Sequence, residues 1–471
     1  MISVVFIKTE YHNFNLSSLD FHLSVKGMGY MLKAKNKTGL VFFPAFDWAI
    51  SPTHPEREER LLYTQDQVFE EGLLDIEGIV EYKPDLVTVK DVQRVHFCIP
   101  DPWTVMTESH FISAGGAKTI GMAVMDGKVK RGFALVRPPG HHANRVVHGA
   151  RGFCNVNIEA IMIEYLRRAY KVDRVAIIDT DCHHGDGTQD IYWHDPDTLF
   201  ISIHQDGRTL YPGSGFINEM GGPNAVGTTI NIPLPPHTSD EGFLYTIKEV
   251  VLPIVQEFKP DLIINSAGQD NHYSDPITNM NFSAQGYARM TDLLQADIAV
   301  LEGGYSIEGA LPYVNTGIIL AMAGLDYEHL TEPDFDEEQY RQSSDITRYI
   351  EQTGVKVLKN WQQRRLLAEQ MRVQPQCARR SRRIFYDTDN IYEVQSENIR
   401  LCEACAGALR IESSSDKKGL ILAVHIPRKA CPECKQQGME WFDSAKPDQF
   451  KQIYLQNLPE DSFIVKKGTA K

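Results

Sequence analysis

The sequence lacks a hydrophobic run long enough to cross a membrane. Its 471 residues are 42% hydrophobic, but no stretch approaches the roughly 18 consecutive apolar residues that a transmembrane helix needs. The first residues, MISVVFIKTEYHNF, carry Lys8, Glu10 and His12 before any apolar run of signal-peptide length. We therefore expect a protein of the reducing cytoplasm that has no membrane partner.

The sequence also lacks phosphate-binding loops and an excess of positive charge. Its glycines form neither GxGxxG nor GxxxxGK[ST], so nucleotide binding is not indicated. Acidic residues number 62 against 48 basic ones, a net charge of -14, which disfavours nucleic acid as a partner because phosphate groups need a basic surface. The segment from Arg364 to Arg383 is locally basic, and is either a solvated helix and linker or a surface for an acidic partner.

From about residue 37 to residue 372, strand-like apolar runs alternate with segments of helical period, such as 158–170 and 241–258. This alternation is typical of an α/β fold in which helices flank a mostly parallel sheet. The predicted strands are 38–46, 132–137, 174–179, 198–204, 228–234, 261–267 and 297–303. Residues 1–36 precede them as an N-terminal arm without an assigned role.

Beyond residue 372 the composition changes. Residues 373–392 are expected to form a basic linker, and residues 393–471 a separate small module of short strands, turns and paired cysteines. CEAC (Cys402, Cys405) and CPEC (Cys431, Cys434) resemble the two knuckles of a zinc ribbon. Four thiolates satisfy tetrahedral zinc without an open position, so we expect a structural Zn²⁺. The module is a candidate docking surface for a protein or subunit.

Chemically active side chains follow the predicted strands where the strands end. In a parallel sheet these ends meet at one edge, which is where active sites lie. A single aspartate there is ordinarily a helix cap or a turn residue, but packing alone does not require a whole set. The set consists of His141 and His142 after 132–137, Asp179, Asp181, His183 and Asp186 around the end of 174–179, Asp270 after 261–267, and Tyr305 after 297–303.

Part of this set has the spacing of a metal site. Asp181 and His183 are two residues apart, so on an extended segment they point the same way, and Asp270 can join them from a neighbouring strand. Three protein ligands with an open position are the pattern of a catalytic zinc, although two carboxylates also suit Fe²⁺ or another divalent ion. Beside such a metal, the histidine pair could transfer protons and Tyr305 could donate to an oxyanion. Together they indicate hydrolysis of an amide.

These residues lie in segments that resemble the signatures of the zinc-dependent histone deacetylase family, closest to its bacterial deacetylase-like and class II branches. The segments are HPEREERL, RPPGHHA, GFCNVN, DTDCHHGDGTQ, SIHQDGRTLYPGSG, SAGQDNHYSDP and LEGGY. The resemblance spans about residues 38–361. It implies the arginase/deacetylase α/β fold and removal of acyl groups from an amine, usually a lysine side chain.

The resemblance also implies a role for each matching position. The metal ligands are Asp181, His183 and Asp270; the general base is His142, backed by Asp186; its electrostatic partner is His141, backed by Asp179; and Tyr305 is the transition-state donor. The acyl tunnel matches Gly152, Phe153, Tyr211 and Gly303. A potassium ion, which the family binds near the catalytic metal, matches Asp179, Asp181, His183, Ser202 and Ile203.

Other functions remain open at this point. A small-molecule amidohydrolase acting on an acetylated amine or polyamine would use the same residues, although Ile277 stands where polyamine-selective relatives carry a glutamate. A two-metal ureohydrolase suits the tandem histidines less well, and a scaffold without catalysis does not need them. The expected substrate is an acylated protein or a small acylated amine. Assembly into a homo-oligomer is left open.

Overall fold

The strands predicted from apolar runs are all present in the computed structural model, which describes residues 32–371 and 377–470. The expected N-terminal arm lies outside the described residues except for its last few, which begin β1. The large sheet is parallel throughout, in the order β2-β1-β4-β10-β9-β6-β7-β8. Its strands are β1 (Lys33–Phe43), β2 (Glu77–Tyr82), β4 (Arg131–Val136), β6 (Val175–Asp179), β7 (Thr198–Gln205), β8 (Thr229–Leu234), β9 (Leu262–Ala267) and β10 (Ile298–Leu301).

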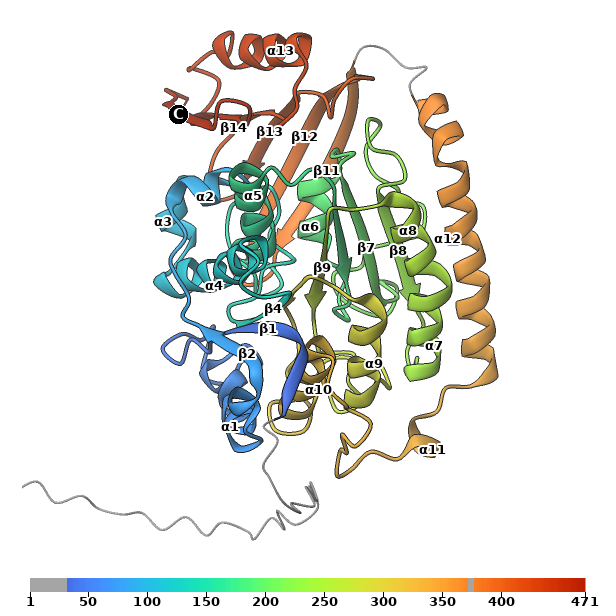
Figure 1. Ribbon diagram of the computed structural model, residues 1–471. Helices are drawn as coiled ribbons and strands as arrows, with labels where there is room; N and C mark the ends of the chain where they lie inside the picture. The colour runs from blue at the N-terminus through green and yellow to red at the C-terminus, as the bar shows by residue number, and fades with distance from the viewer. Residues whose placement is uncertain (1–31, 372–376, 471) are drawn as a thin grey trace, which may run out of the picture. The chain divides into compact units, whose positions relative to one another are not determined.

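Alternate residues of each central strand face opposite sides of the sheet, and both sides are covered by helices (Figure 1). In β4, Phe133 and Leu135 join one hydrophobic core, while Ala134 and Val136 join the other. The second core lies under α4 (Glu108–Met125) and α5 (Ile158–Tyr170). The first lies under α1 (Leu62–Glu70), α7 (Asp240–Tyr245), α8 (Leu252–Phe258), α9 (Ala284–Leu294), α10 (Leu311–Ala323) and α12 (Ser344–Met371). Because helices cover both faces of the sheet, the sequences of these strands are continuous apolar runs.

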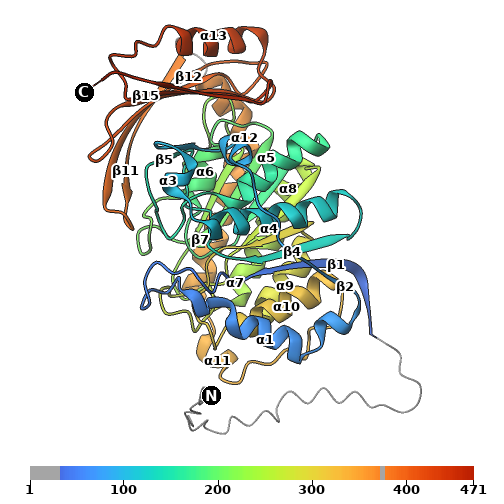
Figure 2. The ribbon, with the colours of Figure 1, turned by 90° about the vertical axis from the view of Figure 1, so that its left-hand side faces the viewer.

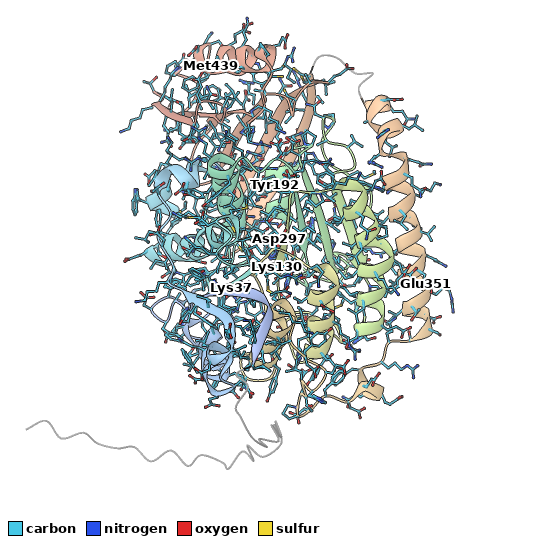
Figure 3. The ribbon with its side chains drawn as sticks, viewed as in Figure 1. Lys37, Lys130, Tyr192, Asp297, Glu351 and Met439 are labelled. Carbon is cyan, nitrogen blue, oxygen red and sulfur yellow. The ribbon has the colours of Figure 1, made fainter. Side chains whose placement is uncertain are left out.

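The parallel strands give the sheet one edge where they all begin and one where they all end. Lys37, Lys130 and Asp297 lie close together at the beginning edge (Figure 3), where the Lys130 amide donates to the Lys37 carbonyl at 2.8 Å. The histidines, the metal-ligand candidates and Tyr305 singled out in the sequence follow strand ends and therefore lie at the opposite edge. Among the described residues, no helix is long and apolar enough to span a membrane.

The C-terminal region forms a second sheet of order β11-β12-β13-β14-β15-β16, with α13 (Pro432–Asp443) packed on it. All neighbours in it are antiparallel except β14 and β15. Its strands are β11 (Cys377–Tyr386), β12 (Ile391–Arg400), β13 (Leu409–Ser415), β14 (Ile421–Ile426), β15 (Gln452–Asn457) and β16 (Ser462–Lys467).

The structure differs here from the expected linker over 373–392, because β11 and the turn after it belong to this sheet. Arg380 and Arg382 occupy partly buried positions of β11 and pair with Glu397 of β12. Charged residues at the inward positions hide the alternation that normally identifies a strand.

The C-terminal sheet also shares a hydrophobic core with the domain that contains the large sheet. Phe97 of β3 (Phe97–Cys98) and Val146 of β5 (Val146–Val147) pack with Ile399, Leu409 and Tyr454 of the C-terminal sheet. The β11–β12 hairpin runs alongside the catalytic domain (Figure 2). The C-terminal sheet is therefore packed on the region that carries the candidate site.

Candidate active site

Three potential metal ligands meet at the carboxyl ends of β6 and β9, which are neighbours in the sheet. One donor atom each from Asp181, His183 and Asp270 lies within 4.8 Å of the others. Nδ1 of His183 lies 2.9 Å from Oδ2 of Asp270 and 3.2 Å from Oδ1 of Asp181. The structure thus brings together the three residues expected to hold the metal.

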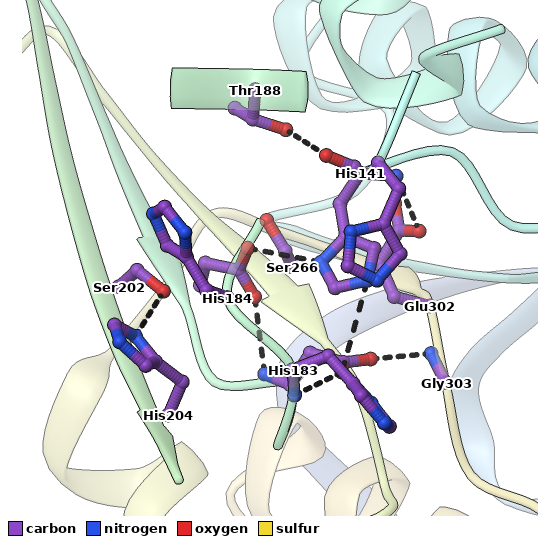
Figure 4. A network of polar contacts seen from close by, with 12 residues as sticks. His141, His183, His184, Thr188, Ser202, His204, Ser266, Glu302 and Gly303 are labelled. Atoms are coloured by element: carbon purple, nitrogen blue, oxygen red, sulfur yellow. Dashed lines mark hydrogen bonds and ion pairs between the residues drawn. The ribbon is translucent and has the colours of Figure 1, made fainter. Parts of the chain in front are cut away.

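Backbone amides and glycines hold the two carboxylates in place. The amide of Gly303 donates to Oδ2 of Asp181 at 2.6 Å, and the amide of Cys182 donates to Oδ1 of Asp270 at 2.7 Å. A Cβ atom on Gly303 would lie 2.3 Å from Oδ2 of Asp270, which no side chain can tolerate. Gly303, expected as a tunnel residue, therefore lies against the carboxylates. His141, His183 and Gly303 converge on this cluster (Figure 4).

The negative charge of this cluster suits it to bind a cation. Asp181 and Asp270 are both 0% exposed, and burial together with the neighbouring Asp181 carboxylate raises the pKa of Asp270. Two buried carboxylates so close together repel each other unless a positive charge lies between them. One imidazole and two carboxylates form a donor set that suits Zn²⁺ or Fe²⁺.

The tandem histidines lie beside the cluster, and a carboxylate holds each of them. Nδ1 of His141 is 3.1 Å from Oδ2 of Asp179, and Nδ1 of His142 is 2.8 Å from Oδ1 of Asp186. The two ring centroids are 4.1 Å apart, and the centroid of His142 is 6.1 Å from that of His183. Both Nε2 atoms are thereby left for other partners.

The environment shifts the pKa values of the two histidines in opposite directions. Burial, followed by the positive charge of His141, lowers the pKa of His142 to about 3. Burial also disfavours the charged form of His141, but the carboxylates of Asp181 and Asp179 outweigh it and raise the pKa of His141 well above its usual value. Neutral His142 can accept a proton, while charged His141 cannot.

Aromatic rings line the approach to these histidines. The ring centroid of Tyr211 lies 5.2 Å from that of His142 and 6.4 Å from that of His183. On the other side, the ring of Phe153 lies 5.6 Å from that of Tyr305. Gly152, at φ +52°, contacts His142 so closely that a Cβ atom would lie 2.4 Å from its ring. The ring of Tyr211 thus lies beside the histidines, and the ring of Phe153 lies beside Tyr305.

Tyr305 is buried and protonated at neutral pH. Burial raises the pKa of its phenol well above the usual value; the Arg60 guanidinium, 4.8 Å from the ring centroid, opposes this, and the carboxylates of Asp270 and Asp181 reinforce it. The amide of Tyr305 donates to Oδ2 of Asp275 at 2.8 Å, which fixes the backbone that carries the phenol. The hydroxyl is therefore protonated and available as a hydrogen-bond donor.

With this geometry in place, similarity to known proteins identifies the family. The family described as "Histone deacetylase domain" matches residues 103–320. The protein named "Probable deacetylase" of Archaeoglobus fulgidus is 45% identical over 326 residues, which are 63% of this chain and 89% of that protein. The chain belongs to the histone deacetylase family.

More distant relatives and a solved structure agree with this membership. Histone deacetylase 15 of Arabidopsis thaliana is 36% identical over 46% of this chain and 40% of that protein. The acetoin utilization protein AcuC of Staphylococcus xylosus is 38% identical over 45% of this chain and 56% of that protein. The "Crystal Structure of HDA15 HD domain" covers 72% of this chain and 99% of that one, with 25% identity and a TM-score of 0.60.

A set of buried charges that the sequence does not reveal supports the site of this histone deacetylase family member. Glu56 pairs with Arg60 at 2.8 Å and with Arg137 at 2.7 Å, and all three side chains are fully buried. Arg60 also donates to the carbonyl oxygens of Glu302 and Gly304 beside Tyr305. Glu56 and Arg60 both lie in the quoted segment HPEREERL, but their spacing in the sequence does not reveal these partners.

Three of the residues expected around potassium lie on adjacent strands, and the other two, Asp181 and His183, follow the first of these strands. Asp179 of β6 is paired in register with Ser202 of β7, and Ile203 follows directly. The other histidines of these segments have structural partners. His184 contacts Ser214 and Gln189 through its two ring nitrogens, at 2.9 and 3.0 Å, and does not belong to the metal cluster.

The four expected thiolates also converge. Sγ of Cys402 lies 3.6 Å from Sγ of Cys405 and 3.7 Å from that of Cys431, and Cys434 completes the cluster. In a tetrahedron with zinc–sulfur bonds of about 2.3 Å, neighbouring sulfurs are about 3.8 Å apart. The spacing thus fits a structural zinc ion. Asn224 of the catalytic domain accepts from the Cys402 amide at 3.0 Å.

Proposed function

We propose that this protein is a metal-dependent amidohydrolase that removes acetyl or longer acyl groups from lysine side chains of proteins. The observation that carries the proposal is the metal-ligand cluster, within 4.8 Å, beside a histidine pair that two carboxylates orient. Membership of the histone deacetylase family supports the same reaction.

The residues that would hold the catalytic ion are Asp181, His183 and Asp270. A divalent cation bound there supplies an acidified water and polarises the acyl carbonyl. The donor set supports Zn²⁺, with Fe²⁺ as the alternative. A potassium ion would be held nearby by Asp179, Asp181, His183, Ser202 and Ile203.

His142 is the general base of the proposed reaction. Its Nδ1 is engaged by Asp186, so Nε2 accepts the proton of the attacking water and later delivers it to the leaving amine. His141, held charged by Asp179 and Asp181, stabilises the negative charge that develops on the substrate. The two adjacent histidines therefore divide proton transfer and charge stabilisation between them.

Tyr305 and the tunnel walls act on the substrate itself. The protonated phenol donates to the carbonyl oxygen as that oxygen becomes negative. Phe153 and Tyr211 flank the alkyl chain of the substrate and exclude water from it. An acyl-lysine chain suits such a passage because its middle is apolar and its reactive end is polar.

A lysine within a polypeptide is favoured over a small amine by the space outside the tunnel. A cavity of about 560 Å³ adjoins Tyr211 and Arg151 and extends along β11 to Ile384 and Phe385. This space supports a substrate that extends beyond the acylated side chain. Deacetylation of a small amine or polyamine is the alternative, since it needs the same catalytic residues.

The test is acyl release by the zinc-loaded protein from matched panels of acyl-lysine peptides and acetylated polyamines, with Tyr305→Phe as the blank. Tyr305-dependent release from peptides is the expected result. Release only from polyamines would establish the alternative, and release from neither would exclude both.

We also propose a structural Zn²⁺ at Cys402, Cys405, Cys431 and Cys434. The sulfur spacing supports tetrahedral zinc, and four protein ligands leave no position for a substrate. The ion would fix the segment before β13 against the start of α13.

A further inference from the structure

The turn between β11 and β12 lies against the loop that carries the tunnel residues Gly152 and Phe153. The amide of Ala150 donates to Oδ2 of Asp389 at 2.7 Å, and the amide of Gly152 donates to Oδ1 of Asp387 at 2.9 Å. Between them, Nε of Arg151 donates to the Phe385 carbonyl at 3.2 Å. Three consecutive residues of the catalytic loop are thus bound by the C-terminal hairpin.

Asp387 also holds the opposite wall of the tunnel. The hydroxyl of Tyr211 donates to the same oxygen, Oδ1 of Asp387, at 3.1 Å. This carboxylate oxygen therefore joins Tyr211 on one side to the amide that directly precedes Phe153 on the other. The separation of the two aromatic walls depends on a residue outside the matched family region, residues 103–320.

The loop needs this support because its backbone is strained. Gly152 and Phe153 have φ values of +52° and +69°, and a bulky side chain rarely adopts this left-handed conformation unless its surroundings enforce it. Amide–carbonyl pairs between Arg151 and Cys154, at 3.0 and 2.9 Å, close the loop from one side. Asp387 holds it from the other, so the Phe153 ring stays edge-on to His54 at 4.3 Å.

We propose that the C-terminal module forms part of the acyl-tunnel wall, with Asp387 as a positioning residue that sets the fit of the substrate's alkyl chain. The inference rests on the proposed function and deepens it: the module determines which acyl-lysine chains are held tightly. Asp387 does not touch the reacting atoms. Its loss should therefore weaken substrate binding much more than it slows the chemical step.

Two substitutions separate positioning from charge attraction. Asp387→Asn keeps an Oδ1 acceptor for the Gly152 amide and the Tyr211 hydroxyl but removes the negative charge, whereas Asp387→Ala removes both. Positioning predicts that the asparagine variant resembles the wild type. If Asp387 instead attracts a cationic substrate, both variants should bind the substrate equally weakly.

Asp461→Asn is the matched control. Asp461 binds Arg94 through both carboxylate oxygens, at 2.7 and 3.0 Å, so it also joins the C-terminal sheet to the catalytic domain. It contacts none of the tunnel residues. Its substitution should leave the KM for peptide unchanged, which separates a general loosening of the module from loss of the tunnel contact.

The first measurement is hydrogen exchange in the full-length zinc-loaded protein over residues 149–155. We expect exchange at the Gly152 amide to be about tenfold faster or more in Asp387→Ala, and unchanged in Asp387→Asn, because the acceptor of this hydrogen bond is lost only in the alanine variant. Unchanged exchange at Gly152 in Asp387→Ala would overturn the proposal. If that variant does not fold, Tyr211→Phe, which removes only the second donor to Asp387, tests the contact through the KM for peptide, and an unchanged KM would overturn the proposal.

The second measurement is the split between KM and kcat on acyl-lysine peptides of increasing acyl length. In Asp387→Ala we expect KM to rise by about 5- to 50-fold, kcat to stay within about threefold, and the preference among acyl lengths to weaken, because the lost contacts hold the tunnel walls and not the reacting groups. A fall in kcat alone, or equal damage in Asp387→Asn, would contradict the inference. If the wild type releases no acyl group, the proposed function fails, while the exchange experiment still tests the contact.

Discussion

Nδ1 of His142 lies 2.8 Å from Oδ1 of Asp186, and the Arg151 guanidinium pairs with the other oxygen of that carboxylate. Although burial opposes it, the positive charge of Arg151 keeps the pKa of Asp186 far below its usual value. Asp186 is therefore ionised at neutral pH and fixes one tautomer of His142. The same Arg151 lies in the loop that the C-terminal hairpin holds, so the proposed general base and the proposed tunnel wall share a support.

Replacing His142 by alanine should remove the general base. We expect kcat on an acyl-lysine peptide to fall by about 10²- to 10⁴-fold, with the catalytic metal retained because His142 is not among its proposed ligands. Steady-state kinetics with metal analysis of the same sample would test this. An unchanged rate would mean that the roles of His141 and His142 are assigned wrongly.

Replacing Tyr305 by phenylalanine removes one hydroxyl and leaves the ring against Arg60 and Phe153. We expect kcat to fall by about 10²- to 10³-fold, as is typical for a lost oxyanion donor, while peptide affinity and thermal stability change little. Equilibrium binding of the peptide to the variant, measured by fluorescence anisotropy, supplies the comparison. Turnover at the wild-type rate would refute the assigned role.

The strands of the large sheet are predictable from the sequence because they are buried on both faces. The apolar runs 174–179 and 261–267 arise because these segments are buried, and their bounds agree to within one residue with those of β6 and β9. The metal cluster follows from the same reasoning, since residues after neighbouring parallel strands meet at one edge. Asp181 and Asp270 are far apart in the chain, but the sheet fixes their proximity.

The supports of the site are less predictable, because they depend on contacts that no spacing encodes. β2, with the sequence EGIVEY, is a half-exposed edge strand and carries no continuous apolar run. Asp387 lies in a turn, where an aspartate is expected for local reasons, and only the folded hairpin brings it to Gly152 and Tyr211. Glu56 likewise finds Arg137 only in the tertiary structure.

Replacing Cys431 by serine should remove the structural zinc without affecting the catalytic metal. We expect the zinc content to fall by about one equivalent and limited proteolysis to accelerate within residues 393–471, because the ion would join the cysteines before β13 to those that begin α13. Cys377→Ser is the matched control, since Cys377 lies in β11 outside the cluster. Unchanged zinc content and proteolysis would exclude the structural ion.

Replacing Glu56 by glutamine should destabilise the fold. Glu56 is the carboxylate between the buried guanidinium groups of Arg60 and Arg137, and removing one member of a buried ion pair typically costs about 3–5 kcal/mol. We expect the free energy of unfolding, measured in urea, to fall by about that amount. Glu58→Gln, two residues further along the chain and without a buried partner, is the comparison. Equal stability of the two variants would show that the Glu56 network contributes little.

Buried histidines should make the protein sensitive to acid, and His148 allows this to be tested at the contact with the C-terminal sheet. His148 is fully buried, with Nε2 2.8 Å from Oγ of Ser413. Burial, followed by the charge of Lys418, lowers its pKa to about 4, against about 6.5 in an unfolded chain. Between these values the unfolded chain binds more protons than the folded one. The stability contributed by the neutral ring is therefore complete above about pH 6.5 and is lost as the pH falls towards 4.

At pH 5 this loss amounts to about 2 kcal/mol for His148 alone. His148→Gln cannot become charged, so the decrease in its free energy of unfolding between pH 7 and pH 5 should be smaller than that of the wild type by about this amount. Urea denaturation at the two pH values measures the difference. Some decrease will remain in the variant, because burial also lowers the pKa values of His96 and His204 to about 3. Equal decreases in the variant and the wild type would mean that His148 does not remain neutral in the folded protein over this range.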